Sequence, residues 1–203
     1  MENTLSQRAA NLLFGIVLLA ATGSAFAQTT PDSSAEVAAT TGATGDEVRP
    51  EVKNLLPNGK LVGKGRLTVW GFQVYDALLW ALPGFRNDKI AAQPFALELA
   101  YLRAFDKEDI AERSIVEMRR AQAITDAQAQ AWTAEMVRVL PNVKKGDRVV
   151  GVNRPGVGAQ FFNNGKLGGE IRDPEFARLF FSIWLGPKTS EPELRSALLA
   201  GAS

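Results

Sequence analysis

The sequence contains no cysteine and no histidine. Without cysteine the chain has no disulfide, no thiol nucleophile and no thiolate metal site. Without histidine it lacks the usual base of a catalytic triad and the commonest metal ligand of proteins. Any catalysis would therefore depend on arginine, lysine, tyrosine, carboxylate or hydroxyl groups. Neither a metal site nor a cofactor is expected.

The chain also lacks a strong charge of either sign. Lysine and arginine number 23 and aspartate and glutamate 22, which gives a formal net charge of +1. Because there is no dense basic stretch either, nucleic acid is not expected as a partner. The only long apolar run covers residues 10–21. It falls short of the roughly 20 apolar residues that a spanning helix needs.

The first 27 residues have the pattern of a secretory signal peptide. Arg8 gives a basic start, residues 10–21 form the apolar part, and Ala25–Ala27 provide small residues before a cut at Gln28. An N-terminal membrane anchor is the alternative. Cleavage would leave 203 − 27 = 176 residues, with no stable membrane span. We expect a periplasmic or secreted protein.

Residues 28–47 are rich in threonine, serine, alanine and glycine, and Val37 is their only large apolar residue. Such a segment cannot bury enough apolar surface to offset the entropy of ordering it. We therefore expect a disordered linker over 28–47, followed by a single domain over 48–203.

Strand patterns come first in this domain. Residues 67–80 are β-rich, with Gly71 as a bulge or turn, and residues 94–103 alternate as a half-buried strand does. Residues 146–154 again favour a strand. The following residues predict a hairpin around Asn164–Gly165.

Four helices are predicted from their capping residues. The first begins at Asp106 and continues to Arg119–Arg120, and the second begins at a Thr125–Gln128 capping box and ends before Pro141. A largely apolar helix follows Asp173–Pro174, and a short one begins around residues 190–193. Together these elements predict an α+β domain with helices layered on a largely antiparallel sheet.

Three segments in this order carry a resemblance to a known family: "GKGRLTVWGFQVYDALLWA", "GDRVVGV" and "DPEFARLFFSIWLGPKTSEPELRSALL". With the paired middle helices, the chain resembles the chalcone isomerase-like family, and within it the exported bacterial branch, over roughly residues 52–200. The resemblance implies an open-faced β-sandwich, in which helices cover one face of a broad sheet and a ligand cleft lies between them.

The family includes both enzymes and binding proteins. Its plant enzymes close a chalcone to a flavanone by intramolecular addition of a phenolate, with an arginine beside a Gly-x-Gly turn steadying the anion. Other relatives are non-catalytic and bind fatty acids in the same cleft. Resemblance in fold does not choose between these activities.

The position of the arginine argues against the family's reaction. The enzyme pattern is Gly-x-Gly-x-Arg, whereas Gly63 and Gly65 here place Leu67 in the arginine position and Arg66 one residue early. One residue along a strand reverses the face, so Arg66 should point away from Tyr75 unless a bulge intervenes. Ile183 likewise replaces a late threonine of the family pattern.

Three residues are the candidate ligand contacts: Arg66, Tyr75 and Arg113. Each has a structural alternative. Arg66 would be an exposed strand residue, Tyr75 a core aromatic with its hydroxyl bonded, and Arg113 a surface residue paired with Glu117. Trp70 is expected in the core. No residue is assigned a catalytic role.

Three functions remain open at this point. The first is a non-catalytic binding protein for a small apolar molecule with an anionic or phenolic end, such as a fatty acid, in the sheet–helix cleft. The second is an isomerase (intramolecular lyase) of the chalcone-to-flavanone type. The third is a structural or interaction module of the cell envelope whose cleft is filled by side chains.

Overall fold

The computed structural model describes residues 49–203, so the predicted signal peptide and the whole of the predicted linker lie outside the described residues. Six strands form one antiparallel sheet in the order of the chain. They are β1 (Lys60–Val69), β2 (Phe72–Ala81), β3 (Phe95–Tyr101), β4 (Arg148–Arg154), β5 (Gly158–Asn163) and β6 (Lys166–Ile171). The largely antiparallel sheet predicted from the sequence is confirmed.

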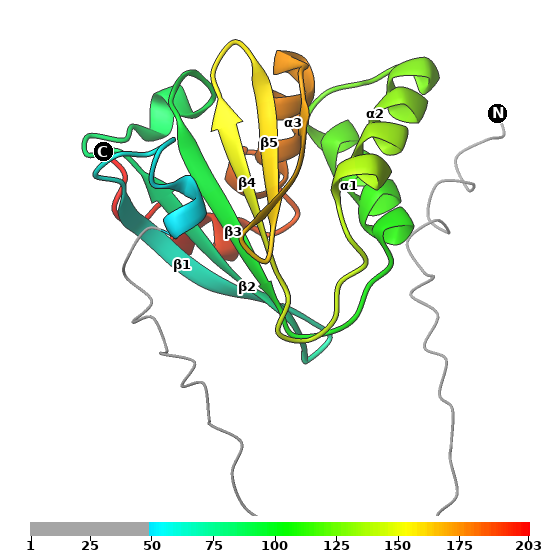
Figure 1. Cartoon of the computed structure of the whole chain (residues 1–203), viewed down its shortest axis with the longest axis horizontal. Coiled ribbons are helices and arrows are strands. Elements are labelled where there is room, and N and C mark those ends of the chain that lie inside the picture. The colour runs from blue at the N-terminus through cyan, green and yellow to red at the C-terminus, as the bar shows by residue number, and fades with distance from the viewer. Residues whose placement is uncertain (1–48) are drawn as a thin grey trace, which may run out of the picture. The chain divides into compact units, whose positions relative to one another are not determined.

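Four α-helices accompany the sheet, with the bounds α1 (Lys107–Ala121), α2 (Asp126–Val139), α3 (Pro174–Leu185) and α4 (Pro192–Leu198). Two 3₁₀ helices, η1 (Pro50–Val52) and η2 (Asn87–Ala92), complete the described elements. Figure 1 shows the strands side by side, with α3 behind the sheet and the α1–α2 pair to one side.

The helix starts follow from local chemistry. The Thr125 side chain accepts a hydrogen bond from the backbone N–H of Gln128, whose own side chain accepts from the Thr125 N–H. This reciprocal pair is the predicted capping box. At α3, Asp173 accepts hydrogen bonds from two backbone N–H groups of the first turn, as predicted. Glu191, one residue after the predicted Ser190, occupies the N-cap of α4.

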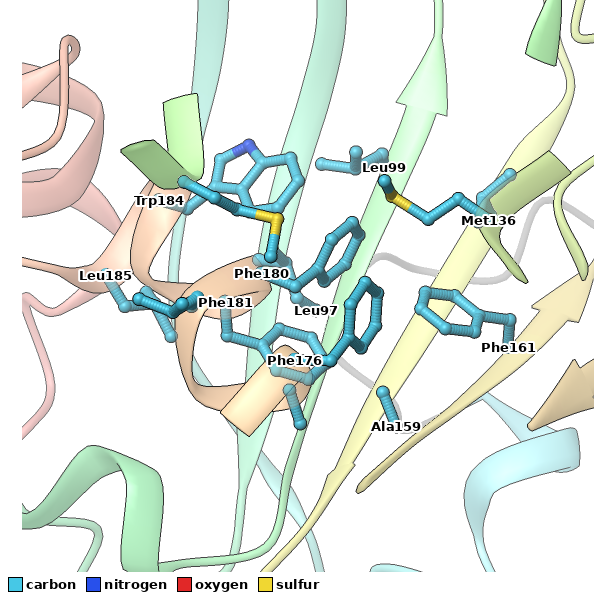
Figure 2. Close-up of a cluster of buried hydrophobic side chains, with 14 of the residues drawn as sticks. Leu97, Leu99, Met136, Ala159, Phe161, Phe176, Phe180, Phe181, Trp184 and Leu185 are labelled. Atoms are coloured by element: carbon cyan, nitrogen blue, oxygen red, sulfur yellow. The ribbon is translucent and has the colours of Figure 1, made fainter. Parts of the chain in front are cut away.

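The main core lies between the sheet and the helices, on what we call the inner face. Figure 2 shows the side chains of α3 packed against those of the strands, together with Met136 of α2. Phe161 and Phe176 are fully buried, and the Phe180 ring lies 5.4 Å from those of both Phe161 and Phe176. Buried aromatic and aliphatic side chains together hold the helices to the sheet.

The opposite, outer face carries a second, smaller core. Leu78, Trp80 and Val150 face this side, where the segment around η1 covers them with the buried side chains of Val52 and Leu56. β3 is consequently buried on both faces. The prediction of a half-buried strand there was wrong, because nothing in its own residues reveals the cover that η1 provides.

Buried charge joins η1 to the sheet. Arg49 donates two hydrogen bonds, of 2.7 and 2.8 Å, to the carboxylate of Glu98, which is 1% exposed. Arg148 pairs with Glu51 and lies 4.0 Å from Glu98. A carboxylate this deep is tolerated because both of its oxygens accept hydrogen bonds from a cation.

Candidate functional site

The glycine pair before Arg66 is a packing feature of β1. A Cβ atom on Gly63 would lie 2.2 Å from the Ala197 carbonyl oxygen, and one on Gly65 would lie 2.7 Å from the Leu194 side chain. Both glycines therefore allow α4 to approach the backbone of β1 closely. The glycines are explained without any ligand.

Arg66 lies on the outer face. Its strand partner is Asp76, whereas Leu67 pairs directly with Tyr75. The predicted one-residue reversal is thus confirmed. The Arg66 guanidinium donates hydrogen bonds of 2.5 and 2.9 Å to the Asp76 carboxylate, and both side chains are exposed.

A shallow hollow of about 530 Å³ surrounds the Arg66–Asp76 pair, lined by residues of β1 and β2. It opens on the outer face, so Arg66 is not a member of the sheet–helix site. Arg66 and Tyr75, both candidate ligand contacts, thus lie on opposite faces of the sheet, as strand parity predicted.

Tyr75 lies at the edge of the inner core, in contact with a second tyrosine. Its ring meets that of Tyr101 edge to face, with centroids 5.9 Å apart. The Trp184 indole N–H donates to the Tyr75 hydroxyl at 2.9 Å. Burial raises the pKa of both tyrosines, so both hydroxyls stay protonated at neutral pH.

The two hydroxyls retain hydrogen-bonding capacity. Tyr75 accepts from Trp184, which leaves its own proton without an acceptor among residues 49–203. Tyr101 likewise makes no hydrogen bond through its hydroxyl within that range. Each can therefore donate to an added oxygen atom.

Arg113 belongs to a charged group beside these tyrosines. It pairs with Glu117, the residue predicted as its partner, at 2.6 Å, and it remains 59% exposed while Glu117 is 7% exposed. Arg120 lies 3.5 Å from the same carboxylate. Burial, and then the charge of Glu117, raise the pKa of Glu191 at the start of α4.

These groups share one electrostatic environment. The charges of Glu117 and Glu191 both act on Tyr75, and Arg113 acts on Glu191. Tyr75 and Arg113 are therefore brought to the same end of the inner core. The tyrosine and carboxylate groups come from β2, β3, α1 and the start of α4.

The space between sheet and helices is filled at its centre. The side chains in Figure 2 are all buried, and Trp184 continues the aromatic row of α3. The other prominent hollow lies between α1 and α2, beside the ion pair of Arg119 and Asp126. Space for a ligand at the tyrosines would therefore require side chains such as Trp184 to move.

Little in the sequence indicates that some of these residues belong to the site. Tyr101 lies near the end of the predicted strand and shares parity with Leu97 and Leu99, so an inward position could have been inferred. Glu117 was found only as a helix partner. The roles of Trp184 and Glu191 depend on contacts between segments far apart in the chain.

The comparison with known families decides the classification. A model of the chalcone isomerase-like family matches residues 42–200. The chain belongs to the chalcone isomerase-like family. The match begins a few residues before the predicted domain start at 48 and confirms the resemblance seen in the sequence.

A solved structure agrees with this fold. It is a fatty-acid binding protein from Arabidopsis thaliana, with a TM-score of 0.55 and 12% sequence identity, covering 76% of this chain and 95% of that one. At this identity the likeness establishes the shared chalcone isomerase-like fold alone. No curated protein matches the sequence.

Further observations on the described residues concern metal ligands, membrane-spanning helices and the inner face. Residues 49–203 hold no cluster of three or more side chains suited to a metal ion. None of their helices is long and apolar enough to cross a membrane. On the inner face, Leu67 lies directly opposite Tyr75.

Proposed function

We propose that this protein is a non-catalytic binding protein, exported to the periplasm or secreted, for a small apolar molecule with an anionic or phenolic end. The observation that carries the proposal is the pair of tyrosine hydroxyls, Tyr75 and Tyr101, which can donate hydrogen bonds at the edge of an apolar core. Sites for small molecules commonly combine mostly apolar walls with a few convergent polar groups.

The polar end of the ligand would accept hydrogen bonds from the two tyrosines. Two hydroxyl donors can bind a carboxylate or phenol oxygen. Because Glu117 and Glu191 would repel a negative charge here, an anionic ligand would also need a cation. Arg113 is more than half exposed and sits on α1, so it can turn from Glu117 towards an added anion. The guanidinium would then bind that anion through two hydrogen bonds.

The apolar body of the ligand would contact Leu67 and Ile183. Both are partly buried against the inner core. By the resemblance, the enzymes of the family have an arginine and a threonine at these two positions. Leucine and isoleucine there remove two polar groups and make this side of the site apolar. A ligand chain in this position gains by burying its surface at roughly 25 cal/mol per Å².

The same geometry argues against the isomerase alternative. A site that stabilises a phenolate needs a fixed cation aimed at the oxygen. Arg66 is on the outer face, and the residue opposite Tyr75 on the inner face is the uncharged Leu67. We expect the protein not to accelerate the bleaching of a 2′-hydroxychalcone above its spontaneous rate. A clear acceleration would restore the isomerase function.

Binding is tested with dodecanoate, using displacement of a fluorescent fatty acid from the full chain. Tyr75→Phe and Tyr101→Phe should each weaken dodecanoate binding by roughly fivefold to tenfold, since each removes one hydrogen bond to a charged group. Arg113→Gln should weaken it as well, and should weaken binding of dodecanol much less.

Arg66→Gln is the matched control, because it removes an arginine from the outer face of the same sheet. Its affinity for dodecanoate should equal that of the unmodified protein. Equal weakening by Arg66→Gln and Tyr75→Phe would move the site to the outer face.

The filled centre of the inner core favours one other candidate, an interaction module of the envelope with no ligand. Gentle mass spectrometry of protein purified from its own cell distinguishes the two. An added lipid-sized mass supports the binding protein. A bare chain that also fails to bind dodecanoate would support the interaction module.

A further inference from the structure

The turn between β1 and β2 places a tryptophan where the backbone disfavours one. Trp70 and Gly71 have φ angles of 50° and 80°. Such two-residue hairpin turns prefer asparagine or aspartate before glycine. A bulky side chain in the left-handed region costs about 1 kcal/mol or more. The sequence keeps a tryptophan there despite that cost.

This tryptophan is exposed. Trp70 is 71% exposed and Phe72 is 49% exposed, whereas Trp80, Trp132 and Trp184 are all buried. The prediction of Trp70 as a core residue was therefore wrong. The turn lies at the lower tip of the domain in Figure 1, away from α3 and the inner core. A strained, exposed aromatic residue on a projecting turn points to a contact outside the molecule.

An arginine lies against this aromatic tip, and more cations lie in the adjoining loops. The Arg103 guanidinium lies 4.7 Å from the centre of the Phe72 ring. Backbone hydrogen bonds from Leu102 to Val74 and from Gly146 to Tyr101 bring two loops beside the turn. Residues 102–107 and 140–147 hold four cations, Arg103, Lys107, Lys144 and Lys145, against two carboxylates, Asp106 and Asp147. Lys144 is paired with Asp147.

We propose that the β1–β2 turn is a membrane-surface contact, with Trp70 and Phe72 entering the interface of a bilayer that contains anionic phospholipid. Tryptophan favours the headgroup region of membranes, where its ring is part apolar and its N–H stays wet. The neighbouring lysines and arginine would attract anionic headgroups. This assignment is independent of the proposed ligand.

A projecting tip suits a lipid interface better than a protein partner. A stable protein interface commonly buries roughly 800 Å² on each side and is broadly complementary in shape. Two aromatic side chains on one turn, with Arg103 beside them, offer a small convex contact instead. The fluid headgroup layer can accommodate that shape without a preformed pocket.

Vesicle binding of the full chain tests the assignment through tryptophan fluorescence. Residues 1–48 contain no tryptophan and the other three tryptophans are buried, so a spectral change on binding reports Trp70. Vesicles of phosphatidylcholine with one third phosphatidylglycerol should shift the emission to the blue. Brominated lipids should quench the shifted component. The shift should be smaller with phosphatidylcholine alone and should weaken as salt is added.

The variants make the test specific. Trp70→Asn should reduce sedimentation with the mixed vesicles roughly tenfold, because it removes the inserted apolar surface. Val116→Ala, which trims an exposed apolar residue on α1, should change nothing. Absence of the blue shift and of quenching would overturn the proposal, as would undiminished sedimentation of Trp70→Asn. A blue shift that grows with protein concentration without lipid would instead assign the turn to self-association.

Discussion

The two faces of the sheet differ in the kind of interaction that covers them. The inner face meets α3 through edge-to-face aromatic rings, with tyrosine hydroxyls at its margin. The outer face carries ion pairs, one of them buried beneath η1 and one exposed at Arg66. Successive residues of one strand point to opposite faces of the sheet. A residue of the inner site and a residue of the outer surface can therefore be direct neighbours in the sequence.

The largest expected effect comes from opening the inner face. Phe161→Ala should destabilise the protein by about 4 kcal/mol, because it leaves a cavity beneath the rings of Phe176 and Phe180. Chemical denaturation followed by circular dichroism measures the change. An effect below that of a surface substitution such as Val116→Ala would show that the aromatic layer does not hold the helices.

Breaking the buried ion pair of the outer face should destabilise the protein less than Phe161→Ala, but still substantially. Arg49→Ala leaves the Glu98 carboxylate buried, with Arg148 as its nearest remaining cation at 4.0 Å. Loss of one partner of a buried pair costs about 3 kcal/mol. The double variant Arg49→Ala with Glu98→Met should recover part of this loss, since no unpaired charge remains.

A failure of that recovery would overturn the ionic explanation of the Arg49 effect. The denaturation midpoint of both variants at low and high salt provides the measurement. Only a modest salt dependence is expected, because the pair is shielded from solvent.

The smallest effect is a pH dependence confined to the inner face. Tyr75 and Tyr101 are the only two tyrosines, so absorbance of tyrosinate reports this site alone. Burial raises the pKa of both in the folded protein. Their stabilising contribution is present below about pH 10, the ordinary tyrosine pKa, and is lost as the pH rises above it.

The folded protein should therefore form tyrosinate only together with alkaline unfolding. Simultaneous recording of tyrosinate absorbance and circular dichroism tests this. Titration of either tyrosine near pH 10 in folded protein would show that its hydroxyl is accessible to solvent.

Much of the fold could be predicted from local residues. The Thr125–Gln128 box, the Asp173 cap and the Asn164–Gly165 hairpin act within a few positions, and each is confirmed. The pairing of Arg113 with Glu117 was likewise visible as a four-residue spacing on a helix. The alternation of side chains along a strand also correctly predicted that Leu67 and Tyr75 share a face of the sheet.

What could not be predicted depended on distant contacts. The burial of β3 on its outer side requires η1, and the Tyr75–Trp184 hydrogen bond joins residues 109 positions apart. For Trp70 the error was the reverse: it was predicted to be buried, as large aromatic residues usually are, and it is exposed. Its exposure follows from the turn at Trp70 and Gly71, where the sequence predicted either a bulge or a turn.

The glycine pair of β1 also has a consequence for the order of folding. Every strand of the sheet neighbours the strand before it, although the connection from β3 to β4 contains α1 and α2. Docking of α4 on Gly63 and Gly65 is different, because it joins the two ends of the domain. We expect this contact to form after the rate-limiting step, so that α4 governs how quickly the folded protein opens rather than how quickly it forms.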